Sequence, residues 1–263
     1  MSKRGTAVVT GASSGIGEVY AQRLAARGYD LILVARRKDR LEKIAAALQS
    51  RFAIRAETIV ADLAQEAGLA EVVRKISDDA SITLLVNNAG IAVIGPVSQT
   101  SAAATHNMIA VNITALTALT MAVLPAFIAR NAGTIVNIGS VAGFAPFAFV
   151  PIYGPTKAYV RQFTQSLQQE LQATGIRVQL VSPASTVTEG FESLGIPPSV
   201  LDPATLMTAE NCVDAALEGL DNGELNTAPS LHDENLLHQF EETSTKLLMA
   251  TQTGQPAPRY LLK

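Results

Sequence analysis

Uninterrupted apolar runs recur along the first 180 residues of the chain, and they constrain its fold more than any other feature. Strands buried in a parallel sheet carry continuous rather than alternating apolar residues, because helices cover both faces of such a sheet. Segments with helical spacing of apolar residues separate the runs. The runs are Ala7–Val9, Leu31–Val34, Ile59–Val60, Leu84–Val86, Ile135–Ile138 and Val178–Val181, and the helical segments are Val19–Ala26, Leu41–Leu48, Leu69–Ile76, Met108–Ile128 and Tyr159–Leu171.

This alternation of strand and helix predicts an α/β fold: a doubly wound, mostly parallel sheet with helices on both faces and right-handed crossovers. The 263 residues contain no internal repeat, low-complexity linker or charge block that would mark a boundary. We therefore expect a single domain over residues 1–263.

The pattern loosens after residue 183. Glycine and proline are frequent between residues 188 and 208, and we expect this region to cover the crevice at the carboxyl ends of the strands, where open α/β sheets bind ligands. A helix near Ala209–Leu220, a short strand around Leu225–Ala228 and an amphipathic helix from about Asp233 to Ala250 should follow. Residues 230–263 should form a C-terminal helix and tail, to which the sequence assigns no function.

Composition argues against several partners and sites. The formal net charge of −3 lacks the positive surplus that nucleic acid attracts, so we expect no nucleic-acid partner. A single cysteine, Cys212, and three scattered histidines predict neither a disulfide framework nor a metal site. The strand-like Thr6–Val9 follows Met1 so closely that a signal peptide does not fit, and we expect a cytoplasmic protein.

The stretch from Ala80 to Ala129 contains no charged residue and is long enough to raise the question of a membrane span. Asn87–Asn88, Gly95–Pro96 and Asn112 interrupt it, and interrupted backbone would be unsatisfied in lipid. We therefore expect no membrane contact. The uncharged helix within this stretch is interpreted as buried partly by its own sheet and partly by another subunit.

A glycine-rich loop, Thr10–Gly17, joins the first predicted strand to the first helix, with glycines at 11, 15 and 17. Glycines allow a sharp turn and bring backbone amides against a pyrophosphate at a helix N-terminus. The spacing differs from the usual G-x-G-x-x-G, and the alternative is an ordinary tight turn. We expect a dinucleotide cofactor here, as in a Rossmann-type fold.

The second predicted strand ends in Arg36–Arg37, where dinucleotide folds commonly carry an acidic residue that holds the ribose 2′-hydroxyl. A guanidinium pairs with a 2′-phosphate that a carboxylate would repel, so Arg36, supported by Arg37, favours NADP(H) over NAD(H). Alternatively, both arginines are solvated loop residues. Asp62–Leu63, after the third strand, could contact the adenine or equally cap a helix N-terminus.

Tyr153 and Lys157 are four residues apart, and residues with this spacing share one face of a helix. A nearby ammonium would lower the phenol pKa from about 10 towards the range that acid–base catalysis needs. Such pairs also occur in many helices without a function. Ser140 follows the strand Ile135–Ile138 and should lie beside the same crevice, which favours a catalytic site.

These residues together resemble the short-chain dehydrogenase/reductase family. The resemblance covers residues 6 to about 190, and the motifs occur in the family's order at close to its spacing. They are Thr10–Gly17, Asp62–Leu63, Asn87–Gly90, Asn112, Ser140, Tyr153 with Lys157, and Pro183 with Thr188. The resemblance implies an oxidoreductase that transfers a hydride between NADP(H) and a carbonyl or alcohol.

The resemblance also implies residue roles. Tyr153 should exchange a proton with the substrate oxygen, and Lys157 should lower its pKa and hold the nicotinamide ribose. Ser140 should hold the substrate oxygen, Asn112 should fix a water in a proton relay, and Thr188 should meet the carboxamide. The expected catalytic residues are thus Asn112, Ser140, Tyr153 and Lys157, and the expected cofactor-binding residues are Gly11, Ser13, Ser14, Ile16, Gly17, Arg36, Arg37, Asp62, Leu63, Asn88, Ala89, Gly90, Tyr153, Lys157, Pro183 and Thr188.

Two positions depart from the family pattern. Pro183–Ala184 stands where the family usually has Pro-Gly, which limits backbone freedom near the nicotinamide. Pro155 lies between Tyr153 and Lys157, and proline is tolerated mainly in the first turn of a helix. The helix should therefore start close to Pro151–Ile152, with a local distortion at Pro155.

Apolar residues follow two of the motifs, and if they line the crevice they predict a small to medium, largely apolar ketone, aldehyde or secondary alcohol as substrate. Alternatively, they pack the core or a second subunit. The helices at 108–128 and 159–171 could pair across a two-fold axis, as helices of this family commonly do, in a homodimer or homotetramer. A non-catalytic NADP(H)-binding sensor is the alternative function. The apolar residues are Val93, Ile94, Phe144, Phe147, Phe149 and Val150.

Overall fold

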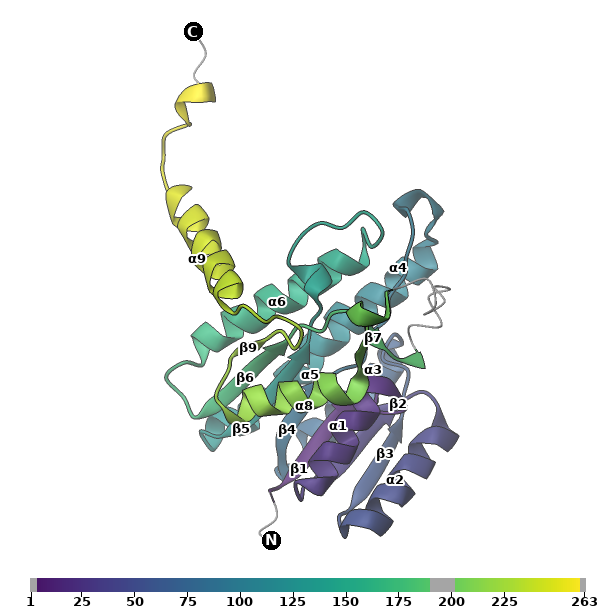
Figure 1. The fold of residues 1–263 in the computed structure, drawn as a ribbon. Helices are drawn as coiled ribbons and strands as arrows, with labels where there is room; N and C mark the ends of the chain where they lie inside the picture. Colours follow the sequence, from purple (N-terminus) through teal and green to yellow (C-terminus); the bar gives the residue numbers. More distant parts are fainter. Residues whose placement is uncertain (1–3, 190–201, 261–263) are drawn as a thin grey trace. The chain divides into compact units, whose positions relative to one another are not determined.

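The computed structural model describes residues 4–189 and 202–260, whose fold is drawn in Figure 1. The chain divides into two compact units, residues 1–229 and residues 230–263. The first unit contains the sheet and all the predicted motifs. The prediction of one domain over the whole chain stays a prediction.

Seven parallel strands form the sheet of the first unit, in the order β3-β2-β1-β4-β5-β6-β9. The strand order reverses between β1 and β4, the topological switch point at which such sheets bind ligands. The predicted doubly wound sheet is confirmed, and a strand lies at each predicted run. The strands are β1 (Thr6–Thr10), β2 (Asp30–Ala35), β3 (Ala56–Val60), β4 (Ile82–Asn87), β5 (Gly133–Ile138), β6 (Ile176–Val181) and β9 (Asn226–Thr227).

Helices cover both faces of this sheet, which is why its strands are apolar on both sides. One core cluster joins the sheet to α1 (Gly15–Ala26), α2 (Lys38–Phe52) and α8 (Ala209–Asp221). A second cluster joins it to α3 (Glu66–Ser77), α5 (Leu116–Ala129) and α6 (Tyr153–Glu170). Figure 1 shows α1 and α8 side by side along one face, where the two helices are in contact.

The uncharged helix differs from the predicted range Met108–Ile128. It begins with α4 (Ala102–Ile109), passes through the π-helical turn η2 (Ala110–Ala115) and continues as α5. A π turn widens the helix locally and is often found at functional sites. Periodicity could not reveal this turn, because a helix without charged residues is apolar around most of its circumference and a shift of helical phase leaves no sign in such a sequence.

This helix is the one stretch within residues 4–189 and 202–260 that is long and apolar enough to cross a membrane. One side of it fills the core against β4 and α3 with residues such as Leu119, Val123 and Phe127. On its other side Met121 and Ile128 are exposed. The helix is therefore a core helix with one uncovered apolar side.

The predicted crevice-covering region, 188–208, is described in part, because residues 190–201 lie outside the described residues. Its remainder includes the turn η5 (Pro203–Thr205) and the strand β8 (Met207–Thr208), which pairs in parallel with β7 (Thr186–Val187). The second unit contains α9 (Asn235–Ala250), which confirms the predicted C-terminal helix, and the turn η6 (Pro258–Tyr260).

Candidate active site

The glycine-rich loop turns from β1 into α1 at the carboxyl edge of the sheet. Gly11 has a φ of +66°, a conformation that residues with a side chain rarely adopt. A Cβ atom at Gly17 would lie 2.3 Å from the carbonyl oxygen of Gly11 and 2.5 Å from Nδ2 of Asn88. The loop therefore has the close backbone packing that a cradle at a helix N-terminus requires.

The Asn87–Gly90 turn is tied to this loop through Thr10. The Thr10 hydroxyl accepts hydrogen bonds from the backbone N–H groups of Asn88, at 3.0 Å, and Ala89, at 2.9 Å. The Asn87 side chain lies between the sheet and α5, where its Nδ2 donates to Oδ1 of Asn137 at 2.9 Å and to Oγ1 of Thr120 at 3.0 Å. Asn87 thus supports the sheet, while Asn88 and Ala89 border the crevice beside the loop.

Arg37 reaches back from the end of β2 to the glycine-rich loop. Its Nε donates to Oγ of Ser13 at 3.1 Å, and its Nη2 donates to Oγ of Ser14 at 2.6 Å. Arg36 is exposed and makes no hydrogen bond or ion pair within the described ranges. The sequence put Arg36 first, but Arg37 is the arginine that the structure holds against the loop.

Asp62 lies in the turn between β3 and α3. Its Oδ1 accepts a hydrogen bond from the backbone N–H of Ala64 at 3.0 Å. Helix α3 starts at Glu66, with Gln65 in the capping position. The alternative that Asp62 is the helix N-cap is therefore wrong, because the chain makes a further turn before the helix begins.

Tyr153 and Lys157 lie on one face of the first turns of α6, as predicted. The Nζ atom of Lys157 is 5.7 Å from the centroid of the Tyr153 ring, and it donates a hydrogen bond to the carbonyl oxygen of Ile138 at 2.8 Å. Ser140 follows β5, and its hydroxyl lies close enough to the Tyr153 phenol to lower the pKa of that group. Three of the four predicted catalytic residues therefore meet at the carboxyl edge of the sheet.

Helix α6 begins at Tyr153, with Ile152 as its capping residue. Pro155 consequently lies in the first turn, where its missing N–H has no helical partner to lose. The predicted helix start close to Pro151–Ile152 is confirmed.

Burial dominates the electrostatics of the pair. It raises the pKa of Tyr153 above its ordinary value, and the nearby Ser140 hydroxyl offsets only part of this rise in pKa. Burial also lowers the pKa of Lys157 to about 8, since that side chain is only 5% exposed. In this structure burial outweighs the other influences on the pKa of Tyr153, and the Lys157 ammonium donates to the Ile138 carbonyl. The expectation that Lys157 lowers the phenol pKa stays a prediction.

Asn112, in the turn η2, is buried, and its side chain connects this turn to Ile91 and to Thr156 on α6. Its Oδ1 accepts from the backbone N–H of Ile91 at 2.8 Å, and its Nδ2 donates to the carbonyl oxygen of Ile91 and to Oγ1 of Thr156, both at 2.9 Å. A Cβ atom at Gly90 would lie 3.6 Å from both Oδ1 of Asn112 and Nζ of Lys157. The fourth predicted catalytic residue therefore borders the same site.

Thr156 is a site residue that the sequence reasoning missed. It is buried, and its hydroxyl accepts from Asn112 and donates to the carbonyl oxygen of Tyr153 at 2.8 Å. Its place three residues after Tyr153 was a signal, because a threonine hydroxyl can reach a carbonyl one helical turn earlier. Its other hydrogen-bond partner, Asn112, is 44 residues away in the sequence, so the local spacing of residues could not predict this contact.

The segment after β6 returns to the crevice. The carbonyl oxygen of Pro183 accepts a hydrogen bond from the backbone N–H of Val141 at 3.0 Å. Thr188 lies against the glycine-rich loop, since a Cβ atom at Gly15 would be 2.8 Å from Cγ2 of Thr188. Pro183 thus lies beside the segment after Ser140, and Thr188 lies beside the glycine-rich loop.

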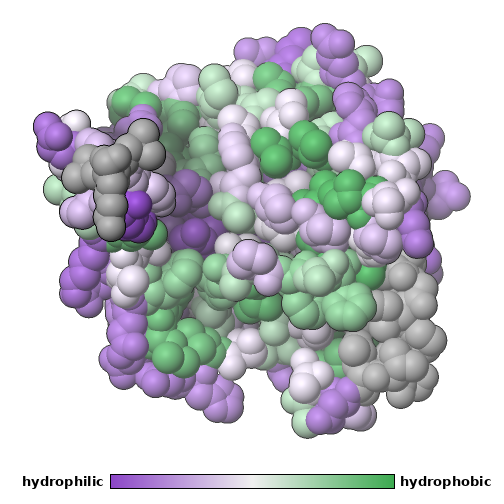
Figure 2. All heavy atoms as spheres, turned by 90° about the horizontal axis from the view of Figure 1, so that it is seen from above, coloured by the Kyte–Doolittle hydropathy of each residue, from purple (hydrophilic) through white to green (hydrophobic). Residues whose placement is uncertain are grey.

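The apolar residues after Ser140 divide between surface and core. Phe147 and Phe149 are 60% and 66% exposed, whereas Val150 is buried. The backbone N–H of Gly95 donates to the carbonyl oxygen of Phe149 at 3.0 Å, so the two predicted apolar segments are joined. Figure 2 looks onto the carboxyl side of the sheet and shows exposed apolar side chains among polar ones on this face.

Residues 5–196 match the sequence pattern of the short chain dehydrogenase family. The chain belongs to the short-chain dehydrogenase family. This short-chain dehydrogenase is similar to a solved short-chain dehydrogenase from Sphingobium yanoikuyae in complex with NADPH, with 44% identity, a TM-score of 0.95 and coverage of 98% of this chain and 100% of the other. It is also similar to the bulky-bulky ketone specific alcohol dehydrogenase from Comamonas testosteroni, with 39% identity, a TM-score of 0.91 and coverage of 99% and 100%.

Sequence comparison adds a further relative of this short-chain dehydrogenase. Sulfoacetaldehyde reductase 2 from Chromohalobacter salexigens is 42% identical over 185 residues, which are 69% of this chain and 73% of that protein. Two of these three relatives are named for a substrate, and the two names differ: one is specific for bulky-bulky ketones and the other reduces sulfoacetaldehyde. Family membership therefore defines the class of chemistry, and the substrate has to be argued from the site.

Proposed function

We propose that this short-chain dehydrogenase is an NADP(H)-dependent oxidoreductase that acts on the carbonyl or alcohol group of a small to medium, largely apolar ketone, aldehyde or secondary alcohol. The proposal rests on one observation: Tyr153, with the Ser140 hydroxyl near its phenol, lies beside the buried Lys157 at the switch-point edge of the sheet. When bound, the nicotinamide supplies or accepts the hydride.

The protein supplies the proton and the alignment. Because burial raises the pKa of Tyr153, its phenol stays protonated at neutral pH and can donate to a carbonyl oxygen. Ser140 adds a second hydroxyl beside the phenol, suited to hold the same oxygen. Both N–H groups of the Asn112 amide donate to protein atoms, so we assign its side chain a positioning role rather than a direct hold on the relay water.

Several features support NADP(H) as the cofactor. The close-packed glycine loop suits a pyrophosphate, and Arg37, together with Ser13 and Ser14, forms a group of donors that suits a 2′-phosphate. The relative from Sphingobium yanoikuyae is described as a complex with NADPH. Arg36, exposed beside this group, can supply a second guanidinium. The remaining proposed cofactor residues are Gly11, Ile16, Gly17, Asp62, Leu63, Asn88, Ala89, Gly90, Tyr153, Lys157, Pro183 and Thr188.

The proposed substrate class follows from the exposed aromatic side chains. Phe147 and Phe149 pack against each other, with ring centroids 5.5 Å apart, and lie in the segment between Ser140 and Tyr153. Exposed aromatic groups beside a catalytic edge favour substrates with apolar substituents. The name of the Comamonas testosteroni relative, specific for bulky-bulky ketones, is consistent with this proposal.

Turnover with a panel of ketones, aldehydes and diketones should separate the proposed enzyme from a sensor. We expect NADPH absorbance to fall with apolar ketones and aldehydes, and to fall at least about ten-fold faster than NADH absorbance at equal concentration, since a charge-assisted phosphate contact is worth that much. Reactions without carbonyl compound are the control. Tight NADPH binding without turnover of any compound would favour the sensor, and equal use of both cofactors would contradict NADP(H) specificity.

We also propose a homodimer or homotetramer built through α5 and α6. Met121 and Ile128 on α5 are exposed apolar residues, and the Tyr159 hydroxyl on α6 hydrogen-bonds with Oγ1 of Thr117 at 2.9 Å. The two helices therefore offer one joined surface for a second copy. Light scattering at micromolar concentration should give the mass of two or four chains, and a stable monomer would remove this proposal. A cytoplasmic location stays a prediction.

A further inference from the structure

Arg37, which we propose binds the 2′-phosphate, already forms an ion pair with a carboxylate of the protein, that of Glu189. Glu189 follows Thr188 and pairs with two guanidinium groups: Nη1 of Arg37 donates to its Oε2 at 2.8 Å, and Arg40 on α2 donates to the same oxygen. Arg37 and Glu189 are 152 residues apart in the chain. The segment that follows β7 therefore contacts the residue just before α2 and the first turn of α2.

We propose that Glu189 is a specificity-determining residue for the cofactor, because its carboxylate competes with the 2′-phosphate of NADP(H) for Arg37 and Arg40. This inference rests on the proposed function. Carboxylate and phosphate oxygens take the same guanidinium N–H groups, and a phosphate carries nearly two negative charges at neutral pH. The carboxylate and the 2′-phosphate carry like charges and would repel each other at the shared Arg37 guanidinium, so the ion pair opens when NADP(H) binds. NAD(H) has no phosphate to compete with the carboxylate.

Arg37 does not depend on Glu189 for its position. It also donates to Oγ of Ser13, to the carbonyl oxygen of Ser13 and to Oγ of Ser14. These bonds keep the guanidinium against the glycine-rich loop when the carboxylate leaves. The phosphate therefore meets a preorganised donor, and Glu189 acts as a competitor rather than as a support.

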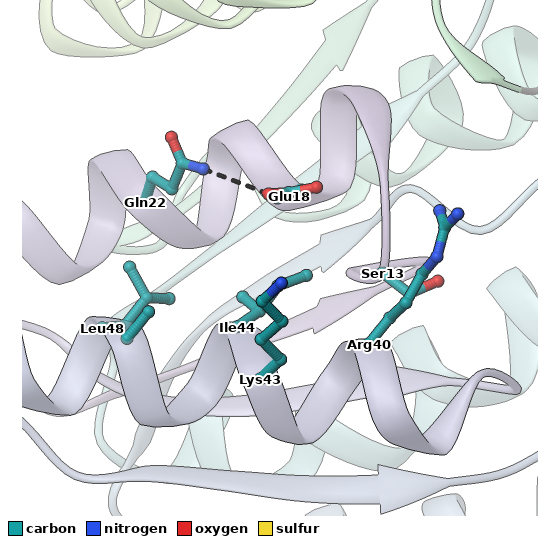
Figure 3. A pocket seen from close by; sticks show the side chains of 8 residues that line it. Ser13, Glu18, Gln22, Arg40, Lys43, Ile44 and Leu48 are labelled. Carbon is teal, nitrogen blue, oxygen red and sulfur yellow. Dashed lines mark hydrogen bonds between the residues drawn. The ribbon is translucent and has the colours of Figure 1, made fainter.

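The surroundings of Arg40 supply room and positive charge. A cavity of about 320 Å³ opens beside Ser13, and Arg40 and Lys43 line it. Figure 3 shows both side chains projecting from α2, opposite Glu18 and Gln22 on α1. Burial raises the pKa of Glu18, and the negative charge of Glu189 raises it further. Glu189 therefore affects the electrostatics of this cavity, because Glu18 lines it. Its release leaves Arg40 free to face a phosphate.

The ion pairs are weak enough to exchange. The side chains of Glu189, Arg37 and Arg40 are all more than two-fifths exposed, and exposed pairs contribute little because water and salt screen them. We therefore expect the competition to reduce NADPH affinity by about five- to ten-fold rather than to prevent binding.

The test measures Kd for NADPH and for NADH, by calorimetry at fixed low salt, in the wild type, E189Q, E189D and E57Q. Glu57 on β3 is the matched control, because it is as exposed as Glu189 and pairs with Lys75 at a distance from the loop. We expect E189Q to tighten NADPH binding about five- to ten-fold and NADH binding less than two-fold, with E57Q unchanged for both. E189D keeps the charge but shortens the reach, so it should tighten NADPH binding to a smaller extent.

An E189Q variant whose NADPH affinity is unchanged or weaker, or which gains equally for both cofactors, would overturn the inference. Wild-type affinity in E189D would also do so, because net charge rather than direct pairing would then explain E189Q. A wild type that binds no NADPH contradicts the proposed function itself, so the two failures are distinguishable.

Discussion

Replacing Tyr153 with phenylalanine should lower kcat/KM for carbonyl reduction by about 10²- to 10⁴-fold, the usual contribution of a positioned proton donor. The substitution removes the hydroxyl alone, so the helix face and the position of Lys157 should persist. Because the lost interaction develops in the transition state, kcat should carry the loss, while Kd for NADPH should change little.

Tyr29→Phe is the matched control for this substitution. Tyr29 immediately precedes β2, at the amino end of the sheet and away from the crevice. Steady-state kinetics of both variants, with NADPH binding measured in parallel, distinguish a lost proton donor from a disturbed fold. A Tyr153→Phe enzyme that keeps more than about a hundredth of wild-type kcat would fall short of the smallest effect expected of a proton donor and would contradict the assignment.

Lys157→Met should remove a gain in stability that the wild type shows as pH rises. Burial lowers the pKa of Lys157 to about 8 from 10.5, so the folded protein loses this proton near pH 8 while the unfolded chain keeps it to higher pH. Unfolding therefore takes up a proton between these values, and raising the pH disfavours unfolding. Between pH 7 and pH 9.5 the linkage amounts to about 2 kcal/mol in the free energy of unfolding.

Urea unfolding at the two pH values checks this, with exposed Lys246→Met as the control for loss of a lysine. Burial raises the pKa of Cys212 to about 11, which costs stability above about pH 9 in all three proteins and cancels in the comparison. We expect the Lys157→Met protein to lack the gain and to be inactive. Parallel pH dependence in wild type and Lys157→Met would show that the ammonium is not desolvated in the folded protein.

Much of the fold and part of the site follow from short-range patterns in the sequence. Continuous apolar runs predicted the parallel strands, because burial on both faces leaves no polar side to a strand. Pro155 predicted the start of α6, because its ring and missing N–H are tolerated mainly in the first turn of a helix. Tyr153 and Lys157 were predicted to share a face because the helical repeat places i and i+4 together.

The sequence by itself therefore determined the layers of the fold, the start of the catalytic helix and the residues that meet at the carboxyl edge. Tertiary structure alone decided which arginine is held on the glycine-rich loop, that Glu189 forms an ion pair with this arginine, and that Thr156 connects Asn112 to α6. It also decided the direction in which the Tyr153 pKa shifts. These properties depend on contacts between distant parts of the chain and on how deeply a group is removed from water, and neither quantity is encoded in the spacing of neighbouring residues.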